Sequence, residues 1–153
     1  MHYRGSLALV VVAAGCTLGI ANAQGTGKSV IASPNAPAAI GPYSQAIKAG
    51  KTVYLSGQIA IDPKTKQLIA DASIEDQTKR VLENLKAVLA ADGMTLDNVV
   101  STTVYVKDLN DFGKVNEVYA TFFTSAPPAR ATVEVARLPK DAKIEISAIA
   151  VHP

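Results

Sequence analysis

Two β-strand patterns in the stretch PPARATVEVARLPKDAKIEI, from Pro127 to Ile146, constrain the fold of this chain more than any other feature. In the first pattern, alternation places Arg130, Thr132 and Glu134 on one face of a strand. Glu145 interrupts a second, apolar pattern near the C-terminus. The two strands can lie side by side in one sheet, so we expect one arginine and one glutamate close together.

This pair of side chains has the chemistry to handle a small carboxylic acid. The Arg130 guanidinium offers a planar fork of N–H donors that matches the two oxygens of a carboxylate. The Glu145 carboxylate can hold and polarise a water molecule. The sequence therefore predicts a site that binds a small carboxylic acid and supplies a hydrolytic water.

Residues 1–23 have the pattern of a secretory signal peptide. Arg4 lies in a short basic region, an apolar run extends from Leu7 to Ile20, and the small-residue step ANA precedes Gln24. The run has fourteen residues, too few for a helix that spans a bilayer. We therefore expect a signal peptide over 1–23, a mature domain over 24–153, a periplasmic or secreted protein, and no stable membrane association after cleavage.

A lipoprotein is a second interpretation of the same segment. Ala13, Ala14 and Gly15 before Cys16 resemble a lipoprotein cleavage box, and Cys16 would then become a lipidated N-terminus. The ANA site is preferred, because cleavage before Cys16 would leave the apolar sequence TLGI behind the lipid without a purpose.

The composition of the mature chain excludes several classes of site. It contains no cysteine and one histidine, His152, so thiol nucleophiles, Ser-His-Asp triads, disulfides and zinc sites built on His or Cys are not expected. Removal of Arg4 lowers the formal charge from +2 to +1, and no run of Lys or Arg forms a basic stripe. We therefore expect no metal and no nucleic-acid partner.

The mature chain shows one pattern of alternating strands and helices. The expected strands are Ser29–Ala32, Tyr43–Ile47, Thr52–Ile61, Val99–Val106, Ala131–Ala136 and Lys143–Val151. The expected helices run from the N-cap Ser73 to just before Gly93, and from Asn110 or Asp111 to Phe123. Two helices can cover only one face of a sheet of five to six strands, so the other face is expected to meet another copy of the chain.

The two helices have identifiable core faces. Ser73 is a good N-cap for the first helix, with Asp76 at the reciprocal position of a capping box. The apolar stripe of this helix consists of Ile74, Thr78, Val81, Leu82, Leu85, Val88 and Leu89. The corresponding face of the second helix consists of Phe112, Val115, Tyr119 and Phe122.

Four segments of the chain resemble the reactive intermediate deaminase family, RidA, also called YjgF. They are GPYSQAI (41–47), YLSGQIAIDPKT (54–65), VYVKDLNDFGKVNEVY (104–119) and PPARATVEVARLPKDAKIEISAIAV (127–151). The resemblance implies an α+β, chorismate-mutase-like fold that forms a homotrimer with a central barrel and active sites in the clefts between subunits. It also implies cofactor-free hydrolysis of 2-imino and enamine acids, such as 2-iminobutanoate and 2-iminopropanoate, to 2-keto acids and ammonia.

The resemblance further implies roles for individual residues. Arg130 matches the arginine that clamps the substrate carboxylate, and Glu145 matches the glutamate that positions the attacking water. The positions in or near the substrate cleft match Tyr43, Ser56, Gly57, Asn116 and Thr132. Thr132 falls where some members carry cysteine, and Ser147 where many carry a second glutamate, so no thiol is needed and the surroundings of Glu145 differ.

A function from another class stays open at this point. The chain could form a non-catalytic trimer that binds small keto acids or partner proteins in the periplasm, as a chaperone-like stress module. RNA cleavage, which has been linked to some relatives, is disfavoured by the near-neutral charge and by export.

Overall fold

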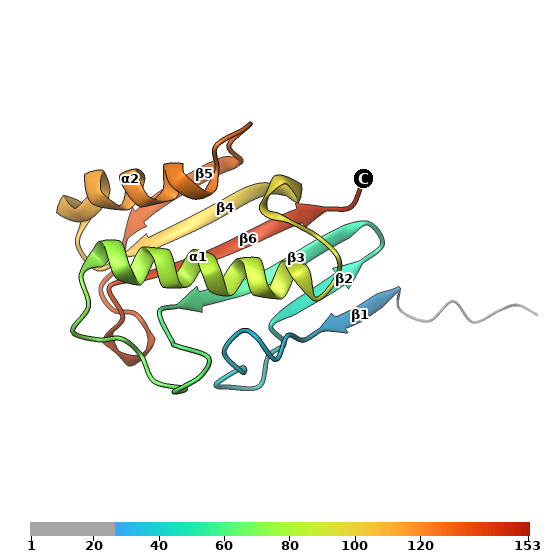
Figure 1. Ribbon diagram of the computed structural model, residues 1–153, viewed down its shortest axis with the longest axis horizontal. Helices are drawn as coiled ribbons and strands as arrows, with labels where there is room; N and C mark the ends of the chain where they lie inside the picture. Colours follow the sequence, from blue (N-terminus) through green and yellow to red (C-terminus); the bar gives the residue numbers. More distant parts are fainter. Residues whose placement is uncertain (1–26) are drawn as a thin grey trace, which may run out of the picture.

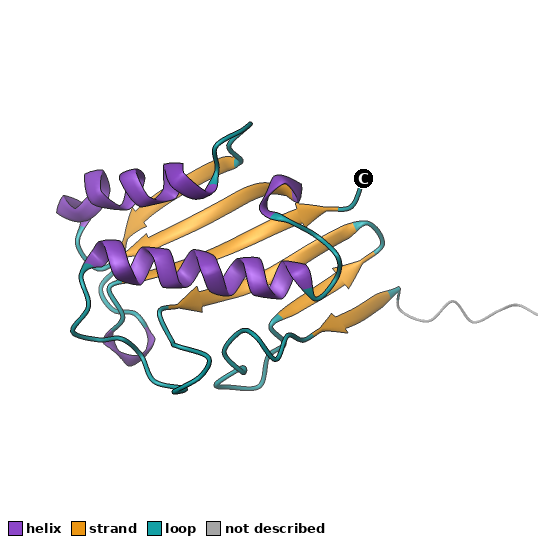
Figure 2. Cartoon of the chain, viewed as in Figure 1, coloured by secondary structure: helices purple, strands orange, loops and turns teal. Residues whose placement is uncertain are grey.

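The computed structural model describes residues 27–153 as two layers, with both α-helices packed on one face of a six-stranded sheet (Figures 1 and 2). The expected signal peptide, the alternative lipidation at Cys16 and the boundary at Gln24 lie outside the described residues. Within residues 27–153, no helix has both the length and the apolar content needed to cross a membrane.

The sheet is antiparallel except at one edge. Its strands are β1 (Lys28–Ile31), β2 (Ala46–Ala49), β3 (Thr52–Ile59), β4 (Val99–Val106), β5 (Ala129–Glu134) and β6 (Ile144–Val151). They lie in the order β1-β2-β3-β6-β4-β5, and only β4 and β5 run parallel among them. A parallel pair needs a crossover connection, and the helix between β4 and β5 provides it.

The position of β4 corrects one expectation from the sequence. The strands that carry Arg130 and Glu145 are not neighbours, because β4 lies between β5 and β6. The crossover places β5 on the free edge of β4, whereas β6 is inserted between β3 and β4. The two strands follow each other in sequence, yet this insertion separates them in space.

Helix α1 (Ile74–Ala90) confirms the predicted cap and stripe. The Ser73 hydroxyl accepts a hydrogen bond from the Asp76 backbone N–H at 3.0 Å and donates to the Asp76 carboxylate at 3.0 Å. All seven predicted stripe residues are buried. Gly93, which follows the helix, has φ of +71°, a left-handed conformation that suits glycine at this position.

Helix α2 (Phe112–Phe122) begins after a short 3₁₀ turn, Leu109–Asp111, and its core face differs from the prediction. Val115 and Tyr119 are buried as expected, and Phe122 is partly buried against the core. Phe112 is 41% exposed, and Phe123, which was not predicted for this face, is buried in the core. Phe123 leaves the helical conformation at the C-cap, and its ring lies 4.5 Å from that of Tyr119. The extended backbone turns this last side chain inward.

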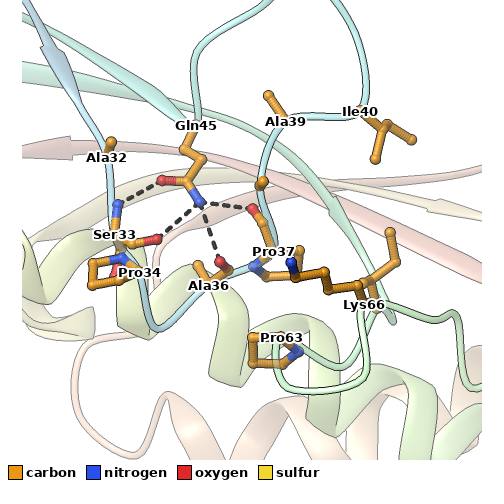
Figure 3. A pocket seen from close by; sticks show the side chains of 12 residues that line it. Ala32, Ser33, Pro34, Ala36, Pro37, Ala39, Ile40, Gln45, Pro63 and Lys66 are labelled. Carbon is orange, nitrogen blue, oxygen red and sulfur yellow. Dashed lines mark hydrogen bonds between the residues drawn. The ribbon is translucent and has the colours of Figure 1, made fainter.

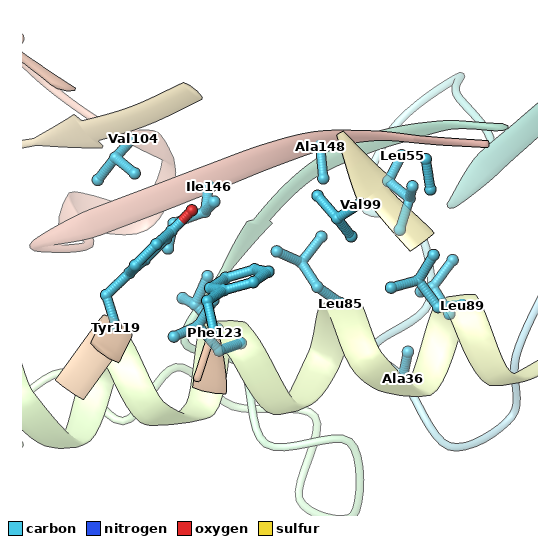
Figure 4. Close-up of a cluster of buried hydrophobic side chains, with 14 of the residues drawn as sticks. Ala36, Leu55, Leu85, Leu89, Val99, Val104, Tyr119, Phe123, Ile146 and Ala148 are labelled. Atoms are coloured by element: carbon cyan, nitrogen blue, oxygen red, sulfur yellow. The ribbon is translucent and has the colours of Figure 1, made fainter. Parts of the chain in front are cut away.

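The hydrophobic core lies between the two helices and the inner face of the sheet. Figure 4 shows Leu85 and Leu89 of α1 on the side of Val99 and Leu55. Tyr119 of α2 reaches toward Val104 and Ile146 of the inner face. The Tyr119 hydroxyl is hydrogen-bonded to the Thr102 hydroxyl at 2.8 Å, so the one polar atom of this ring is satisfied. No α-helix of residues 27–153 covers the outer face of the sheet, where Tyr54 is 51% exposed. Loop residues cover this face only around Ile59 and Tyr105.

His152 has a structural position at the far end of β6. Its Nε2 lies 2.6 Å from Asp92 Oδ2, and the Lys48 ammonium lies 3.1 Å from the same oxygen. The hydrogen bond from His152, followed by that from Lys48, lowers the pKa of Asp92. This cluster joins β2, the turn after α1 and the C-terminus. His152 therefore has a structural role and does not line the expected functional site.

Candidate functional site

Four of the predicted site residues come together around one hollow of about 290 Å³. Tyr43, Ser56, Gly57 and Glu145 line it. Its remaining walls are apolar and consist of Ile40, Ile59 and Pro139. We call this the Glu145 hollow. Sequence reasoning missed its apolar walls, although all three residues lie within or beside the segments that carried the family resemblance.

A β-bulge positions the base of the Glu145 hollow. Leu55 pairs with Ala148 and Gln58 with Ile146, so β3 uses three steps where β6 uses two. The additional residue falls at Ser56-Gly57. A Cβ atom on Gly57 would overlap the Glu145 carboxylate, so a larger residue here would displace that side chain; glycine leaves the space that the carboxylate occupies.

The hydroxyl groups of the hollow are oriented by backbone contacts. Ser56 Oγ donates a hydrogen bond to the Ser44 carbonyl at 2.7 Å. The backbone N–H of Ile40 donates to Tyr43 Oη at 3.2 Å. Because this contact uses a lone pair of the phenol oxygen, the Tyr43 proton is free to be donated into the hollow.

Tyr43 was expected to begin a strand, and this expectation is wrong. Strand β2 begins at Ala46, and Tyr43 lies in the preceding loop. Pro42 lacks an N–H, and the Tyr43 N–H bonds to the Gly41 carbonyl at 2.8 Å, so this segment forms a tight turn instead of a ladder. The turn leaves the Tyr43 ring 46% exposed at the rim of the hollow.

Glu145 is a half-buried carboxyl of the hollow. Burial raises the pKa of this carboxyl above its usual value of 4.5, and no neighbouring charge contributes. A carboxylate with a raised pKa accepts a proton more readily than one in water. The geometry therefore gives Glu145 the properties of a general base.

Arg130 lies at a second place, against α2. Its Nη2 donates to Asn116 Oδ1 at 2.8 Å, and the guanidinium carbon lies 4.7 Å from the Tyr119 ring centre and 5.7 Å from that of Phe112. Across residues 27–153, Arg130 takes part in no salt bridge. The guanidinium is thus oriented by one amide and two rings, with donors left for an external carboxylate.

Thr132 belongs to the same group by strand geometry. It follows Arg130 by two residues on β5, so the two side chains share a face of the sheet. Thr132 pairs with buried Val104, which places it on the helix side, and it is half-buried at the sheet edge. Arg130, Asn116 and Thr132 thus form what we call the Arg130 edge.

The Glu145 hollow and the Arg130 edge lie on opposite faces of the sheet. Arg130 pairs with Thr102, a buried inner-face residue, whereas Glu145 pairs with Tyr105 on the outer face. Strands β5 and β6 are also two strand spacings apart, so the distance between Arg130 and Glu145 across the sheet is about 10 Å before their offset along the strands is added. One copy of the chain therefore does not bring the arginine and the glutamate together.

Comparisons with known proteins agree over the whole described domain. The family model described as endoribonuclease L-PSP matches residues 33–152. A RutC family protein of Pyrococcus horikoshii is 58% identical over 123 residues, which covers 80% of this chain and 97% of that protein. The protein of Salmonella typhimurium named 2-iminobutanoate/2-iminopropanoate deaminase is 56% identical over 125 residues, which covers 80% of this chain and 96% of that protein.

Solved structures show the same fold. The crystal structure of the YjgF gene product from Escherichia coli matches with a TM-score of 0.78 at 51% sequence identity. The match covers 82% of this chain and 99% of that chain.

The contact between Gly57 and Glu145 can be tested directly. We expect Gly57→Ala to push the Glu145 carboxylate toward water, so that its pKa falls toward 4.5. Carboxyl ¹³C NMR titration measures this pKa. Gly113→Ala on α2, where an added Cβ meets nothing within 4 Å, is the matched control and should leave the titration unchanged. If the Glu145 titration is unaltered in Gly57→Ala, the space left by Gly57 does not determine the position of the carboxylate.

Proposed function

This chain belongs to the endoribonuclease L-PSP family, which includes the YjgF/RidA proteins and their α+β fold, and we propose that it is a hydrolytic deaminase. It converts 2-imino and enamine acids, such as 2-iminobutanoate and 2-iminopropanoate, to 2-keto acids and ammonia. The observation that carries the proposal is a guanidinium with no acidic partner among the described residues, together with a glutamate whose pKa is raised by burial. A relative of 56% identity named for this reaction supports it.

The substrate carboxylate binds to Arg130. Asn116 and the rings of Tyr119 and Phe112 hold the guanidinium, so its remaining N–H groups can form a bidentate pair with the carboxylate. This contact orients the planar imine without taking part in bond changes. Thr132 lies beside the same carboxylate as a neutral hydrogen-bonding group.

Glu145 handles the water. A water about 3 Å from the imine carbon attacks it while Glu145 accepts the proton, and a C–O bond forms as the C=N π-bond breaks. Glu145 then returns this proton to the nitrogen. In the resulting carbinolamine the hydroxyl proton moves to the amine nitrogen through Glu145 or a water. The C–N bond then breaks as the C=O bond forms, which gives the keto acid and releases ammonia. No electrons are exchanged, so the residues suffice without a cofactor.

The other residues of the hollow shape and polarise this step. Tyr43, whose oxygen is already engaged by the Ile40 N–H, donates its proton to the substrate or the water. Ser56 is fixed by the Ser44 carbonyl and adds an acceptor at the rim. Ile40, Ile59 and Pro139 form an apolar wall that suits a short alkyl side chain on the substrate.

The reaction requires the Arg130 edge of one copy beside the Glu145 hollow of another. We propose a homotrimer, as the family resemblance implies, in which the outer sheet faces form a central barrel and the sites lie in the clefts between subunits. The exposed apolar residues of the outer face, among them Tyr54 and Ile149, support this arrangement. Each cleft would then combine opposite charges from two copies.

Export is proposed from the sequence pattern of residues 1–23. The mature protein would begin at Gln24 and act in the periplasm or outside the cell. A lipid anchor on Cys16 is the alternative that the same segment allows. The site chemistry is the same in both cases, because every proposed site residue lies at residue 40 or beyond.

Arg130 and Glu145 should fail in different ways when they are changed. Arg130→Ala should weaken both keto-acid binding and imine hydrolysis by roughly 2 to 4 kcal/mol, or about 30- to 1000-fold, because the bidentate contact persists from substrate to transition state. Arg130→Lys should restore little of either. Imine decay is followed with the purified protein coupled to an amino-acid oxidase, and Arg137→Ala, which alters an exposed arginine of the same segment, is the control.

Glu145→Gln should lower turnover about 100-fold or more while keto-acid binding persists or strengthens. Because the pKa of Glu145 is raised and the ionised form is the base, wild-type activity should fall with decreasing pH at a pKa above 4.5. This acidic limb should disappear in the variant, while Glu117→Gln on the exposed side of α2 should keep it. If Arg130→Ala instead hydrolyses the imine as fast as the wild-type protein, the non-catalytic binding module is favoured.

Light scattering of residues 24–153 should give three times the protomer mass at micromolar concentration. Ile149→Glu places a charge on the outer sheet face and should lower this mass, whereas Lys86→Glu on the exposed side of α1 should not. A monomer mass for the unmodified protein would contradict the shared site.

Mass analysis of the N-terminus of protein recovered from its native host tests export. We expect a mature chain that begins at Gln24 and carries no lipid. A diacylated Cys16 would favour the lipoprotein interpretation, and an intact Met1 would contradict export with cleavage.

A further inference from the structure

A second cavity, separate from the Glu145 hollow, lies between the 32–40 loop and the 62–67 loop. Its volume is about 580 Å³, twice that of the hollow and within the range of small-molecule sites. The two cavities share one lining residue, Ile40. Figure 3 shows the second cavity between Pro37 of the first loop and Pro63 and Lys66 of the second.

A buried amide, that of Gln45, holds the loop that forms one wall of this cavity. The Gln45 side chain accepts a hydrogen bond from the Ser33 N–H at 2.6 Å and donates to the carbonyls of Ser33 at 3.2 Å and Pro37 at 2.7 Å (Figure 3). These bonds satisfy backbone groups of the loop that would otherwise face the cavity. The lining that remains is mostly proline, alanine and isoleucine, so it offers a ligand an apolar and largely rigid surface.

One charge faces this apolar surface. Lys66 is the only charged residue that lines the cavity, and across residues 27–153 its ammonium forms no salt bridge. Asp62, the one acid of the 62–67 loop, instead accepts hydrogen bonds from the N–H groups of Lys64 and Thr65. The Lys66 N–H bonds to the Asp62 carbonyl at 2.8 Å, which fixes the point from which the lysine side chain starts.

We propose that this cavity binds a small monocarboxylate with a branched aliphatic or aromatic body. The apolar body occupies the space beside Pro37 and Pro63, and the carboxylate pairs with Lys66 at the mouth. An apolar ligand without the anion would leave Lys66 unused, and an anion without an apolar body would leave the larger part of the cavity empty. The lining thus selects amphipathic acids over phosphate or sugars.

Binding there would also reach the Glu145 hollow through the loop that the two cavities share. Ile40 lines both, and its backbone N–H is the group that engages Tyr43 Oη. A ligand that shifts Ile40 would change the orientation of the Tyr43 hydroxyl. This coupling rests on the proposed deaminase function, whereas binding itself does not.

The test uses 4-phenylbutanoate as the probe and its uncharged amide as the comparison ligand. Titration of the deuterated Arg130→Ala protein, followed by ¹H–¹⁵N TROSY spectra, should shift the resonances of residues 32–40 and 61–66. In this background the proposed substrate carboxylate contact is absent, so the second cavity is observed by itself. Shifts centred on Gly57 and Ser56 instead would show that the probe prefers the Glu145 hollow and would overturn the proposal.

Two neighbouring lysines give a matched pair of variants. Lys66→Gln should weaken binding of the acid about three- to tenfold and leave the amide unaffected. Lys64→Gln changes the same charge on the same loop, at a residue that does not line the cavity, and should leave both affinities unchanged. Equal effects of the two variants, or no saturable shifts at millimolar probe, would also overturn the proposal.

Binding and coupling are separated by a last measurement. In the protein with Arg130 intact, the probe should change the KM for the imine. This change should not follow the concentration dependence of a simple competitive inhibitor, and Lys66→Gln should remove it. Normal probe binding with unchanged kinetics would refute the coupling alone. If the unmodified protein does not hydrolyse imines at all, the deaminase function is refuted, whereas the NMR result for the cavity still stands.

Discussion

The Glu145 carboxylate occupies the space that a side chain at Gly57 would fill, and the candidate site depends on this contact. The bulge in β3 turns Ser56-Gly57 toward the carboxylate, and burial at this point raises the pKa of Glu145. A regular strand with a larger residue here would displace the carboxylate into water, where it would be a weaker base. Position and proton affinity therefore have the same structural cause.

The topology of the sheet decides where the second half of the site lies. The α2 crossover places β5 parallel to β4 at the sheet edge, so Arg130 points toward the helix layer, whereas Glu145 of β6 points to the outer face. Within residues 27–153, Arg130 consequently has no acidic partner and Glu145 has no cationic one. In the proposed association of copies both groups would act on one substrate, and the exposed apolar residues of the outer face would form the contact.

Local patterns predicted the elements well but not their spatial order. The stripe of α1, the Ser73 cap and strand β4 follow from residue periodicity and capping chemistry, and all are found as expected. The insertion of β6 between β3 and β4 depends on non-local pairing, which the alternation of one strand does not encode. Tyr43 was misplaced and the burial of Phe123 was not predicted for a related reason, because turn geometry and a non-helical C-cap override the period of the neighbouring element. The grouping of Tyr43, Ser56, Gly57 and Glu145 came from the family resemblance, since they are distant in sequence.

The charges in the proposed cleft also explain why an arginine can lie near the base without disabling it. In an empty cleft, a guanidinium near Glu145 would stabilise the carboxylate and lower its pKa, against the effect of burial. A bound substrate brings its own carboxylate to Arg130, which neutralises most of this influence. Burial then dominates, the proton affinity of Glu145 rises, and the water beside it becomes easier to deprotonate. In the proposed site, substrate binding and activation of the base would thus be coupled by electrostatics, without any movement of the sheet that carries them.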